Sequence, residues 1–331
     1  MAHREDKVSQ FLLEIKDLKT YFYSPDGIIK AVDGVSLSVD RGNIIGIAGE
    51  SGCGKSVTAL SIMRILQMPP AKIVSGNIYF KGEDLLRLPE EQMRSIRGAQ
   101  ISMVFQEPMT SLNPVLTIGY QIAESIRTHL KASKKESMQR VVETLRAVGM
   151  PSPEERINEY PHQMSGGMRQ RAMIAMALSC NPLLLIADEP TTALDVTIQA
   201  QILELLNTIR AKYGTSIIII THDLGIIAEV TDRVAIMYAG RIVEKASTEE
   251  IFLNPKHPYT LGLLESIPKK QDTRLRPIPG TIPNPLDLPV GCKFQPRCIY
   301  SIDICEEEPS PSVVREGHIV RCYRWKEIGT C

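Results

Sequence analysis

The sequence predicts an α/β fold: a mostly parallel sheet flanked by helices, with an antiparallel β subdomain, a helical subdomain and a small loop-rich C-terminal extension. An apolar run at 44–48 leads into a glycine-rich segment and then a helix-compatible stretch, which is the strand–loop–helix order of parallel sheets. Residues 11–39 alternate apolar and polar side chains, as antiparallel strands do. Residues 251–331 are rich in proline and cysteine and predict a separate extension.

The glycine-rich segment GESGCGKS fits the phosphate-loop pattern GxxxxGK[ST]. Its glycines let successive backbone N–H groups point at phosphate oxygens, and the following helix adds its positive N-terminal end. Lys55 can reach the β- and γ-phosphates, and the Ser56 hydroxyl can complete a Mg²⁺ shell. The predicted ATP-binding residues of this segment are Gly49, Glu50, Ser51, Gly52, Cys53, Gly54, Lys55, Ser56 and Val57.

Length and composition limit the class of protein. A chain of 331 residues predicts one large domain plus an extension, and a hydrophobic content of 43% supplies an ample core. The formal net charge is zero, which argues against a nucleic-acid surface as the main function. The polar N-terminus lacks the apolar stretch of a signal peptide, and no run approaches the ~20 apolar residues that span a bilayer. We therefore expect a cytosolic chain that depends on other subunits for any membrane span.

The N-terminal part predicts two antiparallel strands, at 11–22 and 31–39, with a turn at 24–27. Phe22 can stack on an adenine ring or serve as a half-buried strand aromatic, and the sequence leaves both interpretations open.

A predicted helical insertion, at about 88–165, separates the phosphate loop from the remaining core. It follows a strand at 75–80 and begins with a charged helix at 88–97. A buried strand at 101–105 ends in Gln106, whose side chain suits contact with a metal or water at the carboxyl end of a strand. Amphipathic helices are predicted at 118–130 and 135–148.

A second anion-binding helix start is predicted at Ser165, Gly166 and Gly167, ahead of an apolar helix at 172–179. Ser165 is a good N-cap residue, and the two glycines expose the backbone. One nucleotide scarcely needs two such helix ends from one chain, which suggests an interface shared between subunits.

Asp188 and Glu189 end an apolar strand at 183–187 and predict the chemistry of the site. Asp188 is placed to hold Mg²⁺, directly or through water, and Glu189 to polarise the attacking water as general base. Asp195 precedes a helix at 198–212, and a buried strand at 216–221 ends at His222. His222 can hold the γ-phosphate and the water by hydrogen bonds. Residues 234–244 predict a hairpin.

This ordered set of motifs resembles the ATP-binding subunit of ABC transporters over roughly residues 10–250. Ser-Gly-Gly is the specific feature, because generic phosphate-loop ATPases lack it. The resemblance implies a head-to-tail dimer, homo- or heteromeric, in which ATP lies between the phosphate loop of one subunit and residues 165–167 of the other. It also implies that Phe22 stacks on adenine, that Gln106 contributes to the Mg²⁺ site and that Asp195 couples the two sites.

Residues 106–114, 168–171, 254–260 and the proline-rich 277–289 look like the dipeptide, oligopeptide and nickel importers of that family. The resemblance implies a nucleotide-binding domain at 10–250 and a C-terminal extension at 251–331. It implies an ATPase at the cytoplasmic face of the membrane, with a second ATPase subunit, two transmembrane permeases and, indirectly, an extracytoplasmic solute-binding protein. The preferred solute is a peptide, with nickel or another small solute as alternatives.

Four of the seven cysteines, Cys292, Cys298, Cys305 and Cys322, are separated by five, six and sixteen residues. Zinc sites usually have tighter Cys pairs, whereas iron–sulfur ligand spacing is more permissive. Members of the family with this pattern are similar to ones regarded as [4Fe–4S] binders. We therefore favour a [4Fe–4S] cluster, structural or redox-sensing, with zinc or no metal as alternatives. Cys53 and Cys180 suit small packing residues, and Cys331 a free thiol.

Two rival functions remain open at this point. A soluble ABC-type ATPase acting on DNA or ribosomes would carry two cassettes, a coiled coil or basic arms, whereas this chain has one cassette and balanced charge. A redox regulator would lose ATPase activity when the cysteine tail is oxidised. The basic residues Lys269, Lys270, Arg274 and Arg276 favour a solvated linker over a lipid or partner contact.

Overall fold

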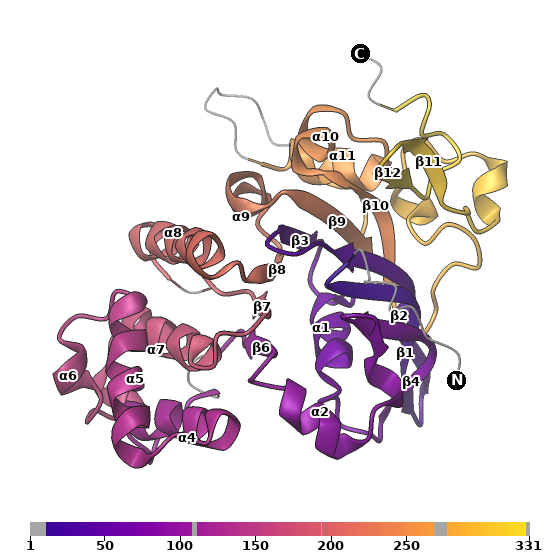
Figure 1. The fold of residues 1–331 in the computed structure, drawn as a ribbon. Helices are drawn as coiled ribbons and strands as arrows, with labels where there is room; N and C mark the ends of the chain where they lie inside the picture. The colour runs from indigo at the N-terminus through magenta and orange to yellow at the C-terminus, as the bar shows by residue number, and fades with distance from the viewer. Residues whose placement is uncertain (1–10, 108–110, 193, 268–276, 329–331) are drawn as a thin grey trace, which may run out of the picture. The chain divides into compact units, whose positions relative to one another are not determined.

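The computed structural model describes residues 11–107, 111–192, 194–267 and 277–328, and these form two compact units (Figure 1). The first unit is built from the described residues of segments 1–40, 44–86 and 220–331, and the second from segments 41–43 and 87–219. Cys331 and the basic residues at 269, 270, 274 and 276 lie outside the described residues.

A four-stranded antiparallel sheet in the first unit confirms the alternation at the N-terminus. Its strands, in the order β2-β1-β4-β5, are β1 (Leu13–Ser24), β2 (Gly27–Val39), β4 (Ala71–Phe80) and β5 (Glu83–Asp84). Strand β4 begins four residues before the predicted position 75, because Ala71 and Lys72 pair with Phe22 and Tyr21 of β1. Cross-strand pairing, which local patterning does not report, therefore extends the strand.

The first unit also holds five strands of a second sheet, in the order β11-β12-β10-β9-β3. These strands are β3 (Ile44–Ala48), β9 (Arg233–Tyr238), β10 (Arg241–Ser247), β11 (Ser312–Arg315) and β12 (His318–Val320). The helices of the unit are α1 (Lys55–Met63), α9 (Leu224–Val230), α10 (Thr248–Leu253) and α11 (Pro258–Glu265), with short 3₁₀ turns at Gln295–Arg297 and Asp303–Glu306. A further 3₁₀ turn, Leu85–Arg87, has its last residue in the second unit.

The C-terminal segment, predicted to be loop-rich, also supplies two strands of this sheet, β11 and β12. Glu244 and Lys245 of β10 pair with Val320 and Ile319 of β12 in antiparallel register. Strand β12 thus covers the side of β10 that does not pair with β9, and β11 pairs with the far side of β12.

The second unit carries strands β6 (Ile101–Val104), β7 (Leu184–Asp188) and β8 (Ser216–Thr221), in the order β8-β7-β6. Its helices are α2 (Glu90–Ile96), α4 (Ile118–Leu130), α5 (Lys134–Ala147), α6 (Pro153–Arg156), α7 (Gly166–Leu178) and α8 (Val196–Tyr213), with a 3₁₀ turn at Pro161–Gln163. The last two residues of β8 belong to the first unit. The predicted helices and strands of this region are confirmed to within two residues, except that α7 begins at Gly166 instead of residue 172 and that α6 was not predicted.

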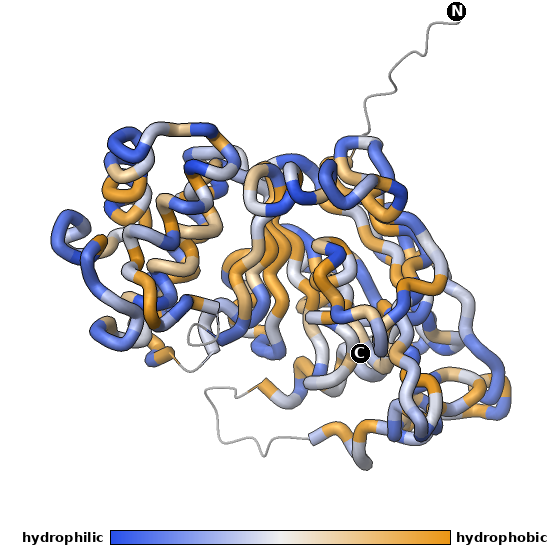
Figure 2. Tube along the Cα trace, turned by 90° about the horizontal axis from the view of Figure 1, so that it is seen from below, coloured by the Kyte–Doolittle hydropathy of each residue, from blue (hydrophilic) through white to orange (hydrophobic). Residues whose placement is uncertain are grey.

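The strands β3, β7 and β8 are buried along their whole length, and Figure 2 draws the central strands mostly in the colour of apolar residues. Runs that are apolar on both faces are typical of parallel sheets covered by helices. Among the helices that the structure describes, none is long and apolar enough to cross a membrane.

Candidate ATP site and cysteine pocket

The phosphate loop occupies residues 49–54, between the end of β3 and the start of α1. Gly54 has φ of +103°, and a Cβ there would lie 2.2 Å from the Ala31 carbonyl oxygen. A Cβ at Gly49, where φ is +152°, would lie 2.2 Å from the Met237 carbonyl oxygen. The path of the loop therefore requires glycine at both ends, as the sequence pattern predicted.

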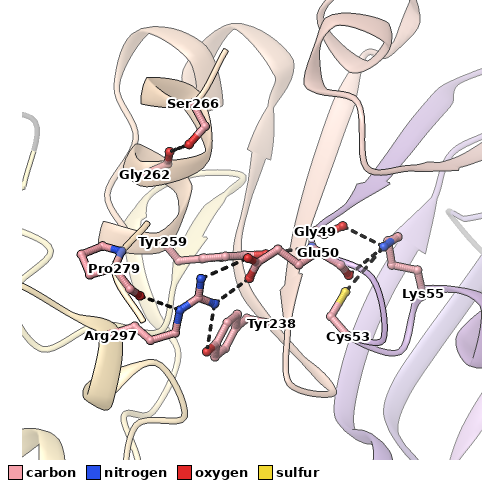
Figure 3. Close-up of polar contacts among 10 residues, drawn as sticks. All are labelled: Gly49, Glu50, Cys53, Lys55, Tyr238, Tyr259, Gly262, Ser266, Pro279 and Arg297. Carbon is pink, nitrogen blue, oxygen red and sulfur yellow. Dashed lines mark hydrogen bonds and ion pairs between the residues drawn. The ribbon is translucent and has the colours of Figure 1, made fainter. Parts of the chain in front are cut away.

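Lys55 is buried and folds over the loop. Its Nζ donates to the carbonyl oxygens of Gly49, at 2.7 Å, and Glu50, at 3.0 Å (Figure 3). The ammonium therefore lies on the backbone segment predicted to hold phosphates. Cys53 is buried beneath it, and burial raises the pKa of the thiol, in keeping with its predicted packing role. Cys180, in the second unit, is also buried.

The other predicted site residues of the first unit lie in α1, after β8 and in β1. Ser56 and Val57 lie in the first turn of α1. His222 is exposed directly after β8. Phe22 is partly buried in β1, where it pairs with Ile29 of β2. Its role towards adenine remains a prediction.

Gln106 and Glu189 come together in the second unit. Strands β6 and β7 are parallel, with Val104 opposite Ala187, so their carboxyl ends meet at one edge. The Gln106 Nε2 donates to Glu189 Oε2 at 3.0 Å, and the Thr192 hydroxyl donates to the same oxygen at 2.8 Å. Glu189 itself has φ of +47°, which turns the chain sharply after the buried Asp188. Two donors therefore orient the predicted general base.

The helix starts at Ser165 and Asp195 are both capped by side chains. The Ser165 hydroxyl accepts the Met168 N–H at 3.3 Å, which confirms its predicted N-cap position. A Cβ at Gly167 would lie 3.0 Å from Ile198 of α8, so this position suits glycine for packing as well. The Asp195 carboxylate accepts the Ile198 N–H at 2.9 Å and caps α8. The sequence analysis placed Asp195 among the ATP-binding residues, as one that couples the two sites, and did not predict this cap.

The four predicted cysteine ligands line one pocket in the first unit, together with His257, Phe294 and Tyr300. The Cys292 N–H donates to the Cys305 carbonyl oxygen at 3.0 Å, which joins two of the loops that carry them. Burial, reinforced by the neighbouring thiols, raises the pKa of Cys292 to about 11 and that of Cys322 to about 12. In the part of the chain that the structure describes, no group of three or more His, Cys, Asp or Glu side chains is arranged to hold a single metal ion.

Sequence reasoning missed two residues that touch the phosphate loop. The Arg297 guanidinium bonds the Glu50 carboxylate, and the Tyr259 hydroxyl accepts the Glu50 N–H (Figure 3). Nothing in the local sequence signals either contact, because Arg297 stands 247 residues from Glu50.

Comparison with known proteins identifies the family to which the chain belongs. Residues 32–192 match the family model described as ABC transporter, and residues 243–305 match that described as oligopeptide/dipeptide transporter, C-terminal region. A probable peptide ABC transporter ATP-binding protein of Sinorhizobium fredii is 51% identical, over 99% of both chains. The oligopeptide transport ATP-binding protein AppD of Bacillus subtilis is 52% identical, over 96% of this chain and 98% of its own.

Among solved structures, a dimeric ATP-binding cassette in a post-hydrolysis state, bound to ADP and Pi, is similar with a TM-score of 0.65. It is 27% identical and covers 71% of this chain and 98% of its own. The likeness confirms the predicted ABC cassette fold, with its parallel core sheet and antiparallel β subdomain. The chain therefore belongs to the ATP-binding proteins of ABC transporters, in the oligopeptide/dipeptide importer subfamily.

Proposed function

We propose that this ABC transporter ATPase binds ATP with Mg²⁺ on its phosphate loop and hydrolyses it to power the import of peptides. The observation that carries the proposal is the Glu189 carboxylate at the end of β7, fixed by hydrogen bonds from Gln106 and Thr192. A general base must be held in one orientation towards its water, and two donors to the same carboxylate oxygen hold Glu189 in this way.

Each predicted site residue has a role in this proposal. Lys55 and the N–H groups of the loop bind the phosphates, and Phe22 stacks on adenine. Ser56, Asp188 and Gln106 hold Mg²⁺, which offsets phosphate charge. His222 hydrogen-bonds the γ-phosphate, while the helix start at 165–167 binds the nucleotide of a partner ATPase, and Asp195 couples the two sites.

The proposed assembly is a dimer of ATPase subunits, homo- or heteromeric, on the cytoplasmic side of two transmembrane permeases. The peptide reaches the permeases from an extracytoplasmic solute-binding protein. The relatives named above are described as peptide or oligopeptide transport proteins, and a dipeptide transport ATP-binding protein of B. subtilis is 50% identical over 94% of both chains, which supports a peptide as the solute. Nickel remains the alternative solute.

Reconstitution tests this function. The purified chain should hydrolyse ATP only when Mg²⁺ is present, and vesicles that also contain candidate permease and solute-binding subunits should accumulate labelled di- or oligopeptide when ATP is supplied. Uptake of nickel but not of peptide would show that nickel is the solute. Salt-sensitive binding to nucleic acid, with no response to permeases, would refute transport and favour a soluble ATPase that acts on nucleic acid.

We further propose that the cysteine pocket holds a [4Fe–4S] cluster through Cys292, Cys298, Cys305 and Cys322. The four cysteines line one pocket, and burial, reinforced by the neighbouring thiols, raises the pKa of Cys292 and Cys322, so a bound cation would be needed to favour their thiolates. A zinc ion would require all four sulfurs around one point, whereas a cluster spreads them over four irons, which fits the absence of a single-ion arrangement among the described residues. Bound there, the cluster would supply a cross-link between loops and a redox-sensitive group.

Anaerobic purification tests the cluster directly. A broad visible band near ~400 nm with stoichiometric iron and sulfide, lost in Cys298→Ser and kept in Cys180→Ser, is expected. Zinc without sulfide would make the pocket a structural zinc site, and neither metal would refute the proposal.

A further inference from the structure

Glu50, the second residue of the phosphate loop, is held at each of its polar groups. Its carboxylate receives two bonds from Arg297, at 2.7 Å and 3.1 Å. Its N–H donates to the Tyr259 hydroxyl at 2.8 Å, and its carbonyl oxygen accepts from Lys55 at 3.0 Å. Figure 3 shows these contacts converging on one residue. Arg297 and Tyr259 both belong to the segment beyond residue 250, so the C-terminal extension contacts the loop directly.

Arg297 is itself fixed before it meets Glu50. Only 6% of the residue is exposed, and its Nε donates to the Pro279 carbonyl oxygen at 2.9 Å. The guanidinium lies over the rings of Tyr238 and Phe294, with its carbon 5.8 Å and 5.9 Å from their centroids. With the guanidinium held by these contacts, its two terminal nitrogens each donate to one oxygen of the Glu50 carboxylate. This bidentate geometry is the one in which arginine binds a carboxylate most strongly.

The linker adds a second contact between extension and loop. Loop residues 50–53 and the linker residues Ile282, Pro283, Pro285 and Leu288 are among those that line one cavity of about 60 Å³. The loop and the extension therefore border a common cavity as well as sharing the ion pair.

The charge of Glu50 gives the pair a consequence for nucleotide binding. A carboxylate within the phosphate loop repels the phosphates of ATP unless a cation neutralises it, and Arg297 supplies a buried positive charge in bidentate contact. Arg297 is buried and the Glu50 side chain is 26% exposed, and an ion pair of this kind is weak evidence for stability.

We propose that Arg297 is a positioning residue for the phosphate loop and that it acts through Glu50. Through this contact the C-terminal extension sets the affinity of the loop for nucleotide. Arg297 lies in the turn between Cys292 and Cys298, so the loop and the cysteine pocket are joined by one short segment. The inference rests on nucleotide binding by this loop.

The test measures the dissociation constant of MgADP by titration calorimetry on the full-length protein. Arg297→Gln should raise it at least tenfold and raise the KM for ATP more than it lowers kcat, and Arg297→Lys should recover part of the affinity. Glu50→Gln in the Arg297→Gln background should restore most of it, because the repelling charge is then absent. Arg324→Gln is the matched control, since Arg324 also lines the cysteine pocket but bonds Glu327 and the Tyr300 carbonyl oxygen.

The outcomes distinguish failure of the proposed function from failure of the positioning role. Wild-type protein that does not bind MgADP would refute the proposed function itself. Unchanged affinity in Arg297→Gln, or equal losses in Arg297→Gln and Arg324→Gln, would refute the positioning role alone. Thermal unfolding of each variant is recorded alongside: if Arg297→Gln loses affinity and stability together and Glu50→Gln restores neither, Arg297 serves folding only and the positioning role is refuted.

Discussion

Gln106 donates its side-chain N–H to Glu189 across the ends of two parallel strands, 83 residues apart in the chain. The register of β6 and β7 brings the two side chains to the same edge, and the Thr192 hydroxyl completes the arrangement. The proposed base is therefore oriented by hydrogen bonds, and its orientation can be altered without removing the carboxylate.

Glu189→Gln should bind ATP with near-normal affinity and lower turnover by at least ~10²-fold, because an amide cannot take a proton from water. Steady-state ATPase assays and nucleotide titration measure the two quantities separately. Glu204→Gln, on the exposed face of α8, is the control and should behave as wild type. Hydrolysis near the wild-type rate in Glu189→Gln would remove Glu189 from the role of general base.

Thr192→Val should lower kcat by about tenfold, since the loss of one hydrogen bond to a charged group is worth roughly 1.5 kcal/mol or more. The KM for ATP should change little, because Thr192 contacts the base and is assigned no contact with the nucleotide. Thr192→Ser keeps the hydroxyl and should retain most of the activity. Equal kcat values in the Val and Ser variants would show that this bond does not orient Glu189.

Glu244 is a buried acceptor that ties the C-terminal segment to β10. Its carboxylate accepts the N–H groups of Lys256, at 2.6 Å, and His257, at 3.0 Å, and lies 2.8 Å from Nε2 of His318 in β12. Glu244→Gln should lower the free energy of unfolding by about 2–3 kcal/mol, because an amide cannot satisfy three donors. Denaturant titration measures the change, and Glu229→Gln on the exposed side of α9 should have no such effect. A loss below ~0.5 kcal/mol in Glu244→Gln would contradict this assignment.

Stability should fall as the pH is lowered from about 6.5 to about 4, owing to His257. Burial lowers the pKa of His257 from 6.5 to about 4, although nearby Glu244 opposes the shift. The folded protein keeps the imidazole neutral while the unfolded chain binds a proton below its pKa of 6.5, so stability is complete above that pH. The loss reaches at most about 3 kcal/mol at pH 4, since each pKa unit corresponds to ~1.4 kcal/mol.

The His257→Asn variant isolates this contribution. His257 accepts the Tyr259 N–H through Nδ1 at the start of α11, and asparagine retains a capping acceptor. Unfolding free energies of this variant should depend on pH less steeply than those of the wild type between pH 6.5 and 4. His162→Asn, at an exposed position, should keep the wild-type slope. Parallel slopes in wild type and His257→Asn would refute the assignment to His257.

Most of the secondary structure and the chemical motifs followed from the sequence. Helix α4 has its predicted bounds, and β8 does too. The differences arise where pairing or capping acts: β4 is lengthened by its partner β1, and α8 begins two residues early because Asp195 caps it. Tertiary contacts set these boundaries, and hydrophobic periodicity carries no information about them.

The sequence by itself determined the phosphate loop, the capped helix start at Ser165 and the strand-end carboxylates. The residues that define each of these motifs lie within about eight consecutive positions. The tertiary structure alone decided that Arg297 neutralises Glu50, that His318 reaches Glu244 and that four cysteines share one pocket. Each of these depends on which distant segments pack side by side. A charge or donor finds its partner only after the long-range strand register and the path of the extension are set, and local residue patterns do not encode that path.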